Sequence, residues 1–280
     1  MSEGAGSVTA VAPPRFRPSV TRLGLLRGRL ELKQFFRGRE SVIFSFMLPI
    51  LLLVIFGAIF TFEIAPGVKF SQYFISGMIA AAQLTNGFQT LGIQIPIERD
   101  RGVLKRLAGS PMPPAAYFIG KVIMVYIVGV LETAILLLIA RLFYGLHLPS
   151  TASGWLTLLW VSALGITACT LCGIAFSSVP REGRRAPAVV TPVALVLQFI
   201  SGVFFVYTDL PRWMQQIAAV FPLKWMAQGM RAVFLPDRFA ANEAAGSWEL
   251  GRVALILGVW VVVGLALCLL TFRWTAREDR

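Results

Sequence analysis

The amino-acid sequence predicts an all-α integral membrane protein with about six transmembrane helices. Of its 280 residues, 56% are hydrophobic and only 14% are charged, whereas soluble domains carry about 25% charged residues. The apolar residues form long runs without charges rather than a periodic pattern with a polar face. The formal net charge of +12 comes from basic residues between these runs, which indicates membrane topology rather than a nucleic-acid partner.

The N-terminal segment divides into a polar tail and a basic helix. Residues 1–18 are rich in Gly, Ala, Ser and Pro and predict a disordered cytosolic tail, and no apolar region of a cleavable signal peptide is found there. Residues 19–40 predict a helix with a basic arc of about 80°, made by Arg22, Arg29, Lys33 and Arg37. We expect this helix to lie in the membrane interface, although a solvated charged leader is the alternative.

The predicted transmembrane domain, residues 41–275, contains the runs that are long enough to cross the bilayer. About 20 predominantly apolar residues are needed to span about 30 Å of hydrocarbon. The spans are expected at 42–62, 71–95, 120–140, 154–178, 187–207 and 253–272. Of the 26 Lys and Arg residues, 19 fall in the segments on the side of the N-terminus, which predicts that both termini are cytoplasmic.

The outer segment before the last span predicts a re-entrant helical hairpin at 209–236. Two apolar stretches, 210–221 and 223–235, are separated by Pro222, and each is too short to span. Asp209 before Pro211 is interpreted as a helix start, and Trp213 suits an interfacial depth. The alternative is an ordinary outer loop with one buried face.

The inner segment 98–110 has a charged, helical pattern and follows the second span. Acidic residues come first and basic residues later, which complements the helix dipole, and Val103, Leu104 and Leu107 form an apolar spine. Such a segment suits docking into a groove on another cytosolic protein, or it is a solvated connector.

Two motifs resemble one known family. The run Glu98-Arg99-x-x-Gly102-x-Leu104-x-x-Leu107-x-x-x-Pro111 is similar to the signature of the type-2 ATP-binding-cassette (ABC) permeases, a family of bacterial drug, polysaccharide and lipid exporters. The stretch from Ser201-Gly202-Val203-Phe204-Phe205 through Pro211, Trp213, Pro222 and Arg231 resembles the fifth span and re-entrant region of that family. Val206-Tyr207-Thr208 departs from it, since drug-exporter relatives often have Pro there.

This resemblance implies a permease subunit of an ATP-driven exporter in the bacterial inner membrane. The 98–110 segment would be the coupling helix that docks on a cytosolic ABC ATPase, with Glu98 helping to fix the helix start and Gly102 permitting close approach, and 19–40 would be the connecting helix. ATP and Mg would bind in that partner, because this chain has no phosphate-binding loop; we expect no cofactor and no enzymatic activity in the chain itself. The expected assembly contains a second permease copy or paralogue and exports an amphiphilic drug, lipid or glycan, as in antibiotic resistance.

A polar stripe on the second span is the candidate transport path. At 100° per residue six polar side chains fall within about 80°, namely Gln72, Ser76, Gln83, Asn86, Thr90 and Gln94. We expect Gln83, Asn86, Thr90, Gln94 and the intramembrane Glu132 to line the path, with Glu132 bonded from the stripe. Polar contacts between helices are the alternative for the stripe, and a structural hydrogen bond is the alternative for Glu132.

The remaining chemistry-bearing residues predict no metal site. His147 is isolated, and Cys169-x-x-Cys172 lies within an apolar run without further ligands. A secondary, ion-coupled transporter is the alternative function, disfavoured because Glu132 is a single intramembrane carboxylate and no repeat relates the two halves.

Overall fold

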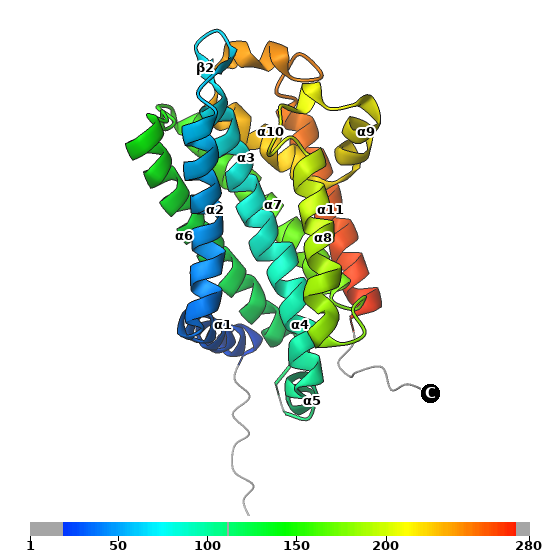
Figure 1. Ribbon diagram of the computed structural model, residues 1–280. Coiled ribbons are helices and arrows are strands. Elements are labelled where there is room, and N and C mark those ends of the chain that lie inside the picture. Colours follow the sequence, from blue (N-terminus) through cyan, green and yellow to red (C-terminus); the bar gives the residue numbers. More distant parts are fainter. Residues whose placement is uncertain (1–18, 111, 273–280) are drawn as a thin grey trace, which may run out of the picture.

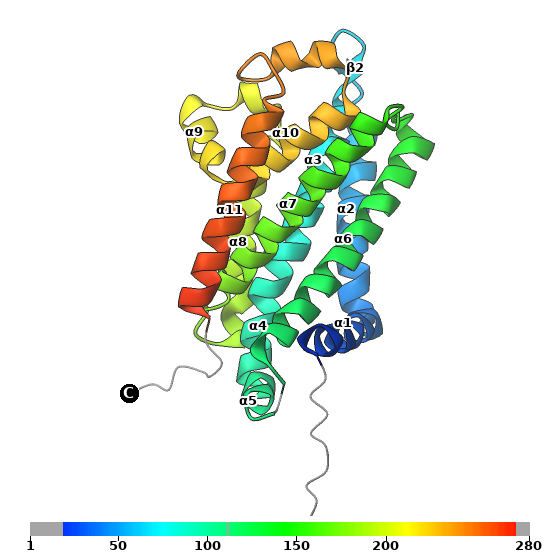
Figure 2. The ribbon, with the colours of Figure 1, turned by 180° about the vertical axis from the view of Figure 1, so that it is seen from behind.

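Helix α1 (Val20–Arg37) lies across the lower end of a bundle of long helices, as Figures 1 and 2 show. The structure is a computed structural model that describes residues 19–110 and 112–272. Six helical segments run lengthwise in chain order: α2 (Arg39–Ile59), α3 (Phe70–Leu84) continued by η1 (Thr85–Gln89) and α4 (Thr90–Asp100), α6 (Pro114–Tyr144), α7 (Ala152–Phe176), α8 (Ala186–Ile200) and α11 (Leu250–Thr271). The described chain is all-α, as predicted, apart from one small hairpin.

The short elements lie at the two ends of this bundle. We name the ends after the predicted topology: the outer end carries the antiparallel hairpin β1 (Glu63–Ala65) and β2 (Val68–Lys69), followed along the chain by η3 (Tyr207–Asp209), α9 (Arg212–Val220), α10 (Pro222–Phe234) and η4 (Asp237–Asn242). The inner end carries α5 (Val103–Ala108) and η2 (Gly183–Arg185). In Figure 1, α5 projects beyond the rest of the bundle.

Three helices of the described chain are long and apolar enough to cross a membrane by length and composition: α6, α7 and α11. A shorter apolar helix covers Ser45–Ile59. The protein is therefore a membrane protein with several apolar helices, and the full count of six spans stays a prediction.

The path from α3 to α4 is the centre of the bundle. Almost every side chain of α3 is buried, so its polar and apolar sides both face protein. On the apolar side, the Phe74 ring stacks on Phe56 of α2 with centroids 4.9 Å apart. Then η1 interrupts the helix with a π-helical turn, a feature that often marks functional positions and that the sequence pattern did not predict.

Glycines let η1 and α7 touch backbone to backbone. A Cβ atom built on Gly87 would lie 2.8 Å from the Cβ of Cys169, and one built on Gly173 would lie 2.5 Å from the Gly87 carbonyl oxygen. Small residues at such contacts allow transmembrane helices to approach closely. The π-helical turn is thereby held against α7.

The fifth predicted span is shorter than expected. We predicted a helix through residue 207, but α8 ends at Ile200 and the chain turns at Gly202, whose φ is 74°. Fifteen residues rise about 22 Å, less than the hydrocarbon thickness. The turn is fixed from α3, because the backbone N–H of Tyr207 donates to the Tyr73 hydroxyl at 2.9 Å.

The outer stretches form two helices separated as predicted at Pro222. The interpretation of Asp209 as the helix start was wrong: Asp209 lies in η3, and α9 begins at Arg212 after an extended Pro211. Pro222 is the first residue of α10, where its missing N–H costs nothing. Figures 1 and 2 show α10 crossing the outer end of the bundle, and it packs against α3, α7 and α11.

Candidate functional site

The inner end contains a buried charge network that joins α1, α4 and α6. Lys121 of α6 is fully buried and donates to Glu31 of α1 at 2.9 Å and to Glu98 of α4 at 2.5 Å. Arg27 donates to the second oxygen of Glu31 at 2.5 Å, and the Tyr117 hydroxyl donates to Glu98 at 2.8 Å. The two carboxylates thus receive donors from neighbouring helices, which is the condition for burying such charges.

The two residues after Glu98 attach the same corner to the other side of the bundle. Arg99 donates to the Ser177 carbonyl oxygen at the end of α7 at 3.1 Å, and Asp100 accepts from the Gly183 backbone N–H at 2.5 Å. Three consecutive charged residues therefore contact three different parts of the chain. The end of α4 is therefore held by contacts with α6, the end of α7 and η2.

The predicted coupling helix is divided in the structure. Glu98 was expected to fix the start of a helix over 98–110, but it lies near the end of α4, and α5 covers only Val103–Ala108. Gly102 was expected to permit close approach; instead, its φ is 68° and a Cβ there would meet nothing within 4 Å. Glycine is favoured because the turn between α4 and α5 is left-handed.

The apolar spine of this segment enters the chain's own core at Leu104 alone, since Val103 and Leu107 are half-buried. Leu104 is completely buried in a cluster with Ile95 and Tyr117, and Leu107 packs against it half-buried. The exposed residues of α5 are Lys105, Arg106 and Ala108. Pro111 of the predicted motif lies outside the described residues, as do the tail 1–18 and residues 273–275 of the predicted transmembrane domain.

The centre of the bundle brings three of the predicted path residues together. Asn86, in the π-helical turn, donates to the Glu132 carboxylate on α6, as the sequence predicted for Glu132. Gln83 donates to Ser162 of α7 at 3.0 Å and to Thr133 of α6 at 3.5 Å. These side chains are almost completely buried, so in this structure they make the polar contacts between helices that were the alternative to path lining.

The other two predicted path residues lie apart from this centre. The Thr90 hydroxyl donates to the Thr85 carbonyl oxygen of its own helix at 3.1 Å. Gln94 lines a cavity of about 240 Å³ at the inner end, which is also lined by Glu31, Glu98 and Arg101. Gln94 therefore belongs to the charged inner corner rather than to the central cluster.

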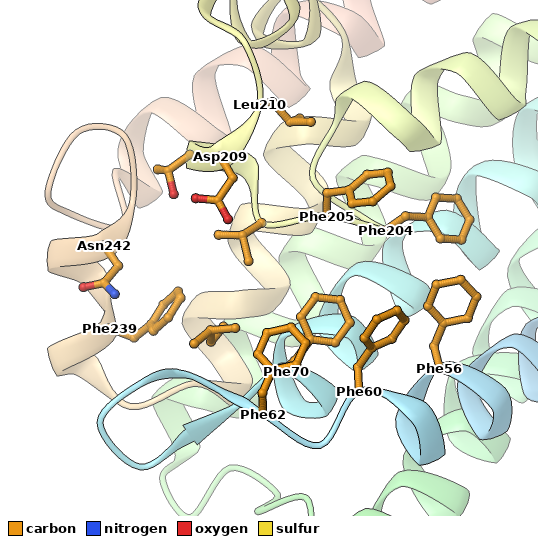
Figure 3. A pocket seen from close by; sticks show the side chains of 13 residues that line it. Phe56, Phe60, Phe62, Phe70, Phe204, Phe205, Asp209, Leu210, Phe239 and Asn242 are labelled. Carbon is orange, nitrogen blue, oxygen red and sulfur yellow. The ribbon is translucent and has the colours of Figure 1, made fainter.

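An aromatic cavity of about 490 Å³ lies at the outer end, between α2, the start of α3, the 204–210 turn and η4. Figure 3 shows most of its phenylalanine rings on one side, and Asp209, Asn242 and the Phe239 ring on the other. Its rings come from segments far apart in the sequence: Phe56, Phe60, Phe62, Phe70, Phe204, Phe205 and Phe239. An amphiphilic molecule with an apolar body and a polar end fits this lining.

A buried ion pair braces the outer end beside this cavity. Arg231 of α10 binds both oxygens of Glu243, at 2.5 and 3.1 Å, and its guanidinium lies 4.8 Å from the centre of the Tyr73 ring. This pair was not predicted from the sequence, because Glu243 lies in a polar loop without any periodic pattern. Of the three predicted re-entrant residues, Pro211 and Trp213 are exposed, whereas Pro222 is buried at the junction of α9 and α10.

Within the described residues, no three His, Cys, Asp or Glu side chains are grouped so as to hold a metal ion. Cys169 and Cys268 are buried, and their thiols contact the Met226 sulfur at 3.6 Å and the Leu171 carbonyl oxygen at 2.9 Å. These contacts are those of packing residues in a helical core.

Comparison with known proteins gives a consistent result over most of the chain. The family model described as ABC-2 type transporter matches residues 28–235. The chain is 24% identical over 242 residues to the transport permease ycf38 of Porphyra purpurea, which covers 82% of each chain. It is 25% identical over 191 residues to the inner membrane transport permease YadH of Escherichia coli K12, covering 66% of this chain and 72% of that one.

Proposed function

Because the chain belongs to the ABC-2 type transporter family, we propose that this transport permease is the membrane subunit of an ATP-driven exporter. ATP is hydrolysed by a separate cytosolic ABC ATPase, which also holds the Mg ion. The assembly lies in the bacterial inner membrane with both termini cytoplasmic, in agreement with the excess of Lys and Arg in the segments assigned to the inner side. The exported molecule is an amphiphilic drug, lipid or glycan.

The projecting helix α5 is the observation that carries this proposal. It extends beyond the bundle (Figure 1) on a corner that Glu98, Arg99 and Asp100 attach to α1, α6, the end of α7 and η2. A force on α5 is therefore transmitted to several helices at once. Its exposed Lys105 and Arg106 suit an acidic groove on the ATPase, so docking uses the charged side of the segment.

The continuous helical path from α4 through η1 to α3 connects the two ends of the molecule. It begins at the charged inner corner, passes the Asn86–Glu132 contact, and ends beside the aromatic outer cavity at Phe70. We infer that Gln83, Asn86 and Glu132 become part of the path when α3 separates from α6 and α7. A second copy of this chain, or a paralogue, completes that path, and α1 acts as the interfacial connecting helix.

The coupling role of α5 is tested at its two flanking glycines. In the permease–ATPase complex, we expect Gly102→Val to uncouple ATP hydrolysis from transport, because a β-branched residue does not adopt a φ of 68° without strain. Gly109→Val is the matched control, since Gly109 has a φ of −81° and the nearest atoms to its built Cβ are 3.7 Å away.

The measurements are substrate-stimulated ATPase activity and transport into inverted vesicles. Gly102→Val is expected to reduce stimulation and transport about tenfold, which a loss of about 1.4 kcal/mol in coupling free energy produces, while the complex still co-purifies. Equal activity of the two variants and the unmodified complex would show that the segment is only a connector.

A further inference from the structure

A second outer cavity, separate from the aromatic one, lies on the other side of the 207–210 segment. It has a volume of about 620 Å³ and is formed by η3, α9, the start of α10, residues 244–245 and the start of α11. Its charged lining consists of Arg212, Lys224, Arg252 and Glu249. The side chains of Glu249 and Arg252 pair with each other at 3.0 Å, so Arg212 and Lys224 leave the cavity cationic.

Lys224 is the unusual member of this lining. Only 4% of it is exposed, and its ammonium group donates to the Gln228 side-chain oxygen at 2.5 Å and lies over the Trp225 ring. Among the described residues, no carboxylate forms an ion pair with it. An ammonium group has three donors, and burying it without a counter-charge costs several kcal/mol. Burial lowers the pKa of Lys224 to about 8, which agrees with a missing anion.

Helix α9 has an apolar side and a polar side. Its outward side is apolar and exposed, with Trp213 at 57%, Ile217 at 46% and Val220 at 62% exposure. Its other side contributes Arg212 and Gln215 to the cavity. Gln215 is fixed there, because its side chain donates to the Leu210 carbonyl oxygen at 2.8 Å. A helix with these two sides suits the boundary between headgroups and acyl chains.

We propose that this cavity binds the phosphate of an anionic phospholipid from the outer leaflet. The phosphate oxygens accept from Lys224 and Arg212, and an acyl chain lies along Trp213, Ile217 and Val220. The chemistry of the site is phosphate recognition by two cations beside an apolar helix face. This assignment is independent of which molecule the transporter exports.

The test is lipid binding to the purified full chain in detergent, measured by native mass spectrometry. Phosphatidylglycerol is expected to bind about tenfold more tightly than phosphatidylcholine of the same acyl chains: both lipids offer the phosphate, but the choline cation of phosphatidylcholine is repelled by Arg212 and Lys224. Lys224→Met and Arg212→Gln are each expected to remove most of this preference. Lys69→Met, which removes an exposed cation of the outer hairpin, is the matched control and should keep it.

Two results would overturn the proposal. One is an equal affinity for the two lipids in the unmodified chain; the other is a loss of preference in Lys69→Met as large as in Arg212→Gln. Arg212 is exposed, so its variant carries the test if Lys224→Met does not fold. Inorganic phosphate at millimolar concentration distinguishes the source of the anion: if it displaces phosphatidylglycerol completely, the site is one for free phosphate and the lipid assignment is wrong.

Discussion

Two buried lysines at opposite ends of the molecule have opposite surroundings. Lys121 at the inner end lies between the carboxylates of Glu31 and Glu98, at 2.9 and 2.5 Å. Lys224 at the outer end has an amide oxygen and an aromatic ring beside it, and its helix neighbour Arg231 already takes the nearby Glu243. Carboxylates of the chain balance the charge of Lys121, whereas no carboxylate among the described residues pairs with Lys224.

This difference underlies the two proposals, a mechanical role for the inner end and a binding role for the outer end. The carboxylates around Lys121 come from α1 and α4. Any movement of α5 and α4 relative to α1 and α6 therefore disturbs a largely buried ion-pair network. Such a network favours a small number of discrete arrangements, which is what coupling requires. Lys224 forms no ion pair with the residues that the structure describes. It lines the cavity in which we propose that the phosphate binds.

The largest expected effect follows from removing the inner lysine. Lys121→Met leaves Glu31 and Glu98 close together without their shared cation, and breaking a buried ion pair in this way costs about 3–5 kcal/mol. We expect a corresponding loss in the free energy of unfolding, measured by denaturant titration of the purified chain in detergent. Lys105→Met on the exposed side of α5 is the control and should be nearly neutral.

A double variant makes this prediction specific. Adding Glu98→Gln to Lys121→Met removes the carboxylate that the single variant leaves without its ion pair, whereas Glu31 keeps its pair with Arg27, so part of the lost stability should return. A single variant as stable as Lys105→Met would mean that the network does not brace the inner end.

The same substitution at the outer end is expected to have the opposite sign. Without anionic lipid, Lys224→Met removes a buried ammonium that lacks a counter-ion, so the variant should be more stable than the unmodified chain at pH 7, by about 1–3 kcal/mol. The pKa of Lys224 is lowered from 10.5 to about 8 by burial and then by Arg231. The unfolded chain therefore holds this proton up to about pH 10.5, and the folded chain releases it near pH 8.

The stability of the unmodified chain should accordingly rise between pH 8 and 10.5, and the advantage of Lys224→Met should shrink over that range. Comparing the two proteins isolates Lys224 from the other charged and titratable groups around it, which are Tyr207, Arg212, Arg231, Glu243, Glu249 and Arg252. A constant difference in the free energy of unfolding between the two proteins from pH 7 to 10.5 would contradict the lowered pKa of Lys224. A variant that is less stable than the unmodified chain at pH 7 would do the same.

Hydrophobic runs and breaker residues were enough to predict the class of this protein and most of its helices. The family resemblance, inferred from the 98–111 and 201–231 motifs, is confirmed by the family match. Pro222 correctly predicted the break between α9 and α10, because proline as the first residue of a helix is a local signal. A bond from the polar stripe to Glu132 was also predicted, since a buried carboxylate requires a partner, and the structure identifies Asn86 as the donor.

The failures come from contacts that depend on the path of the chain in space. The end of α8 at Ile200 depends on a turn held by Tyr73, more than 120 residues earlier. The role of Leu104 depends on a cluster that only folding assembles, so the sequence could not distinguish a docking face from a core face. The π-helical turn at 85–89 depends on backbone contact between Gly87 and Gly173, which no periodicity in one helix records.

The smallest effect on stability is expected midway between the two lysines, where the predicted path residues lie. Gln83→Cys loses two hydrogen bonds, each contributing about 1 kcal/mol, and the Gln83 side-chain oxygen has no hydrogen-bond partner among the described residues.

In a background without Cys169, Cys172 and Cys268, a cysteine at Gln83 or Asn86 should react with a small aqueous thiol reagent only when α3 separates from α6 and α7. We expect this in one nucleotide state of the permease–ATPase complex, with a rate at least about tenfold above the nucleotide-free one. Phe74→Cys and Ala81→Cys are equally buried controls on the apolar side of α3 and should stay unreactive in every state. Labelling of all four positions at equal rates would indicate general loosening of the bundle, and labelling of none would leave Gln83 and Asn86 as polar contacts between helices outside the path.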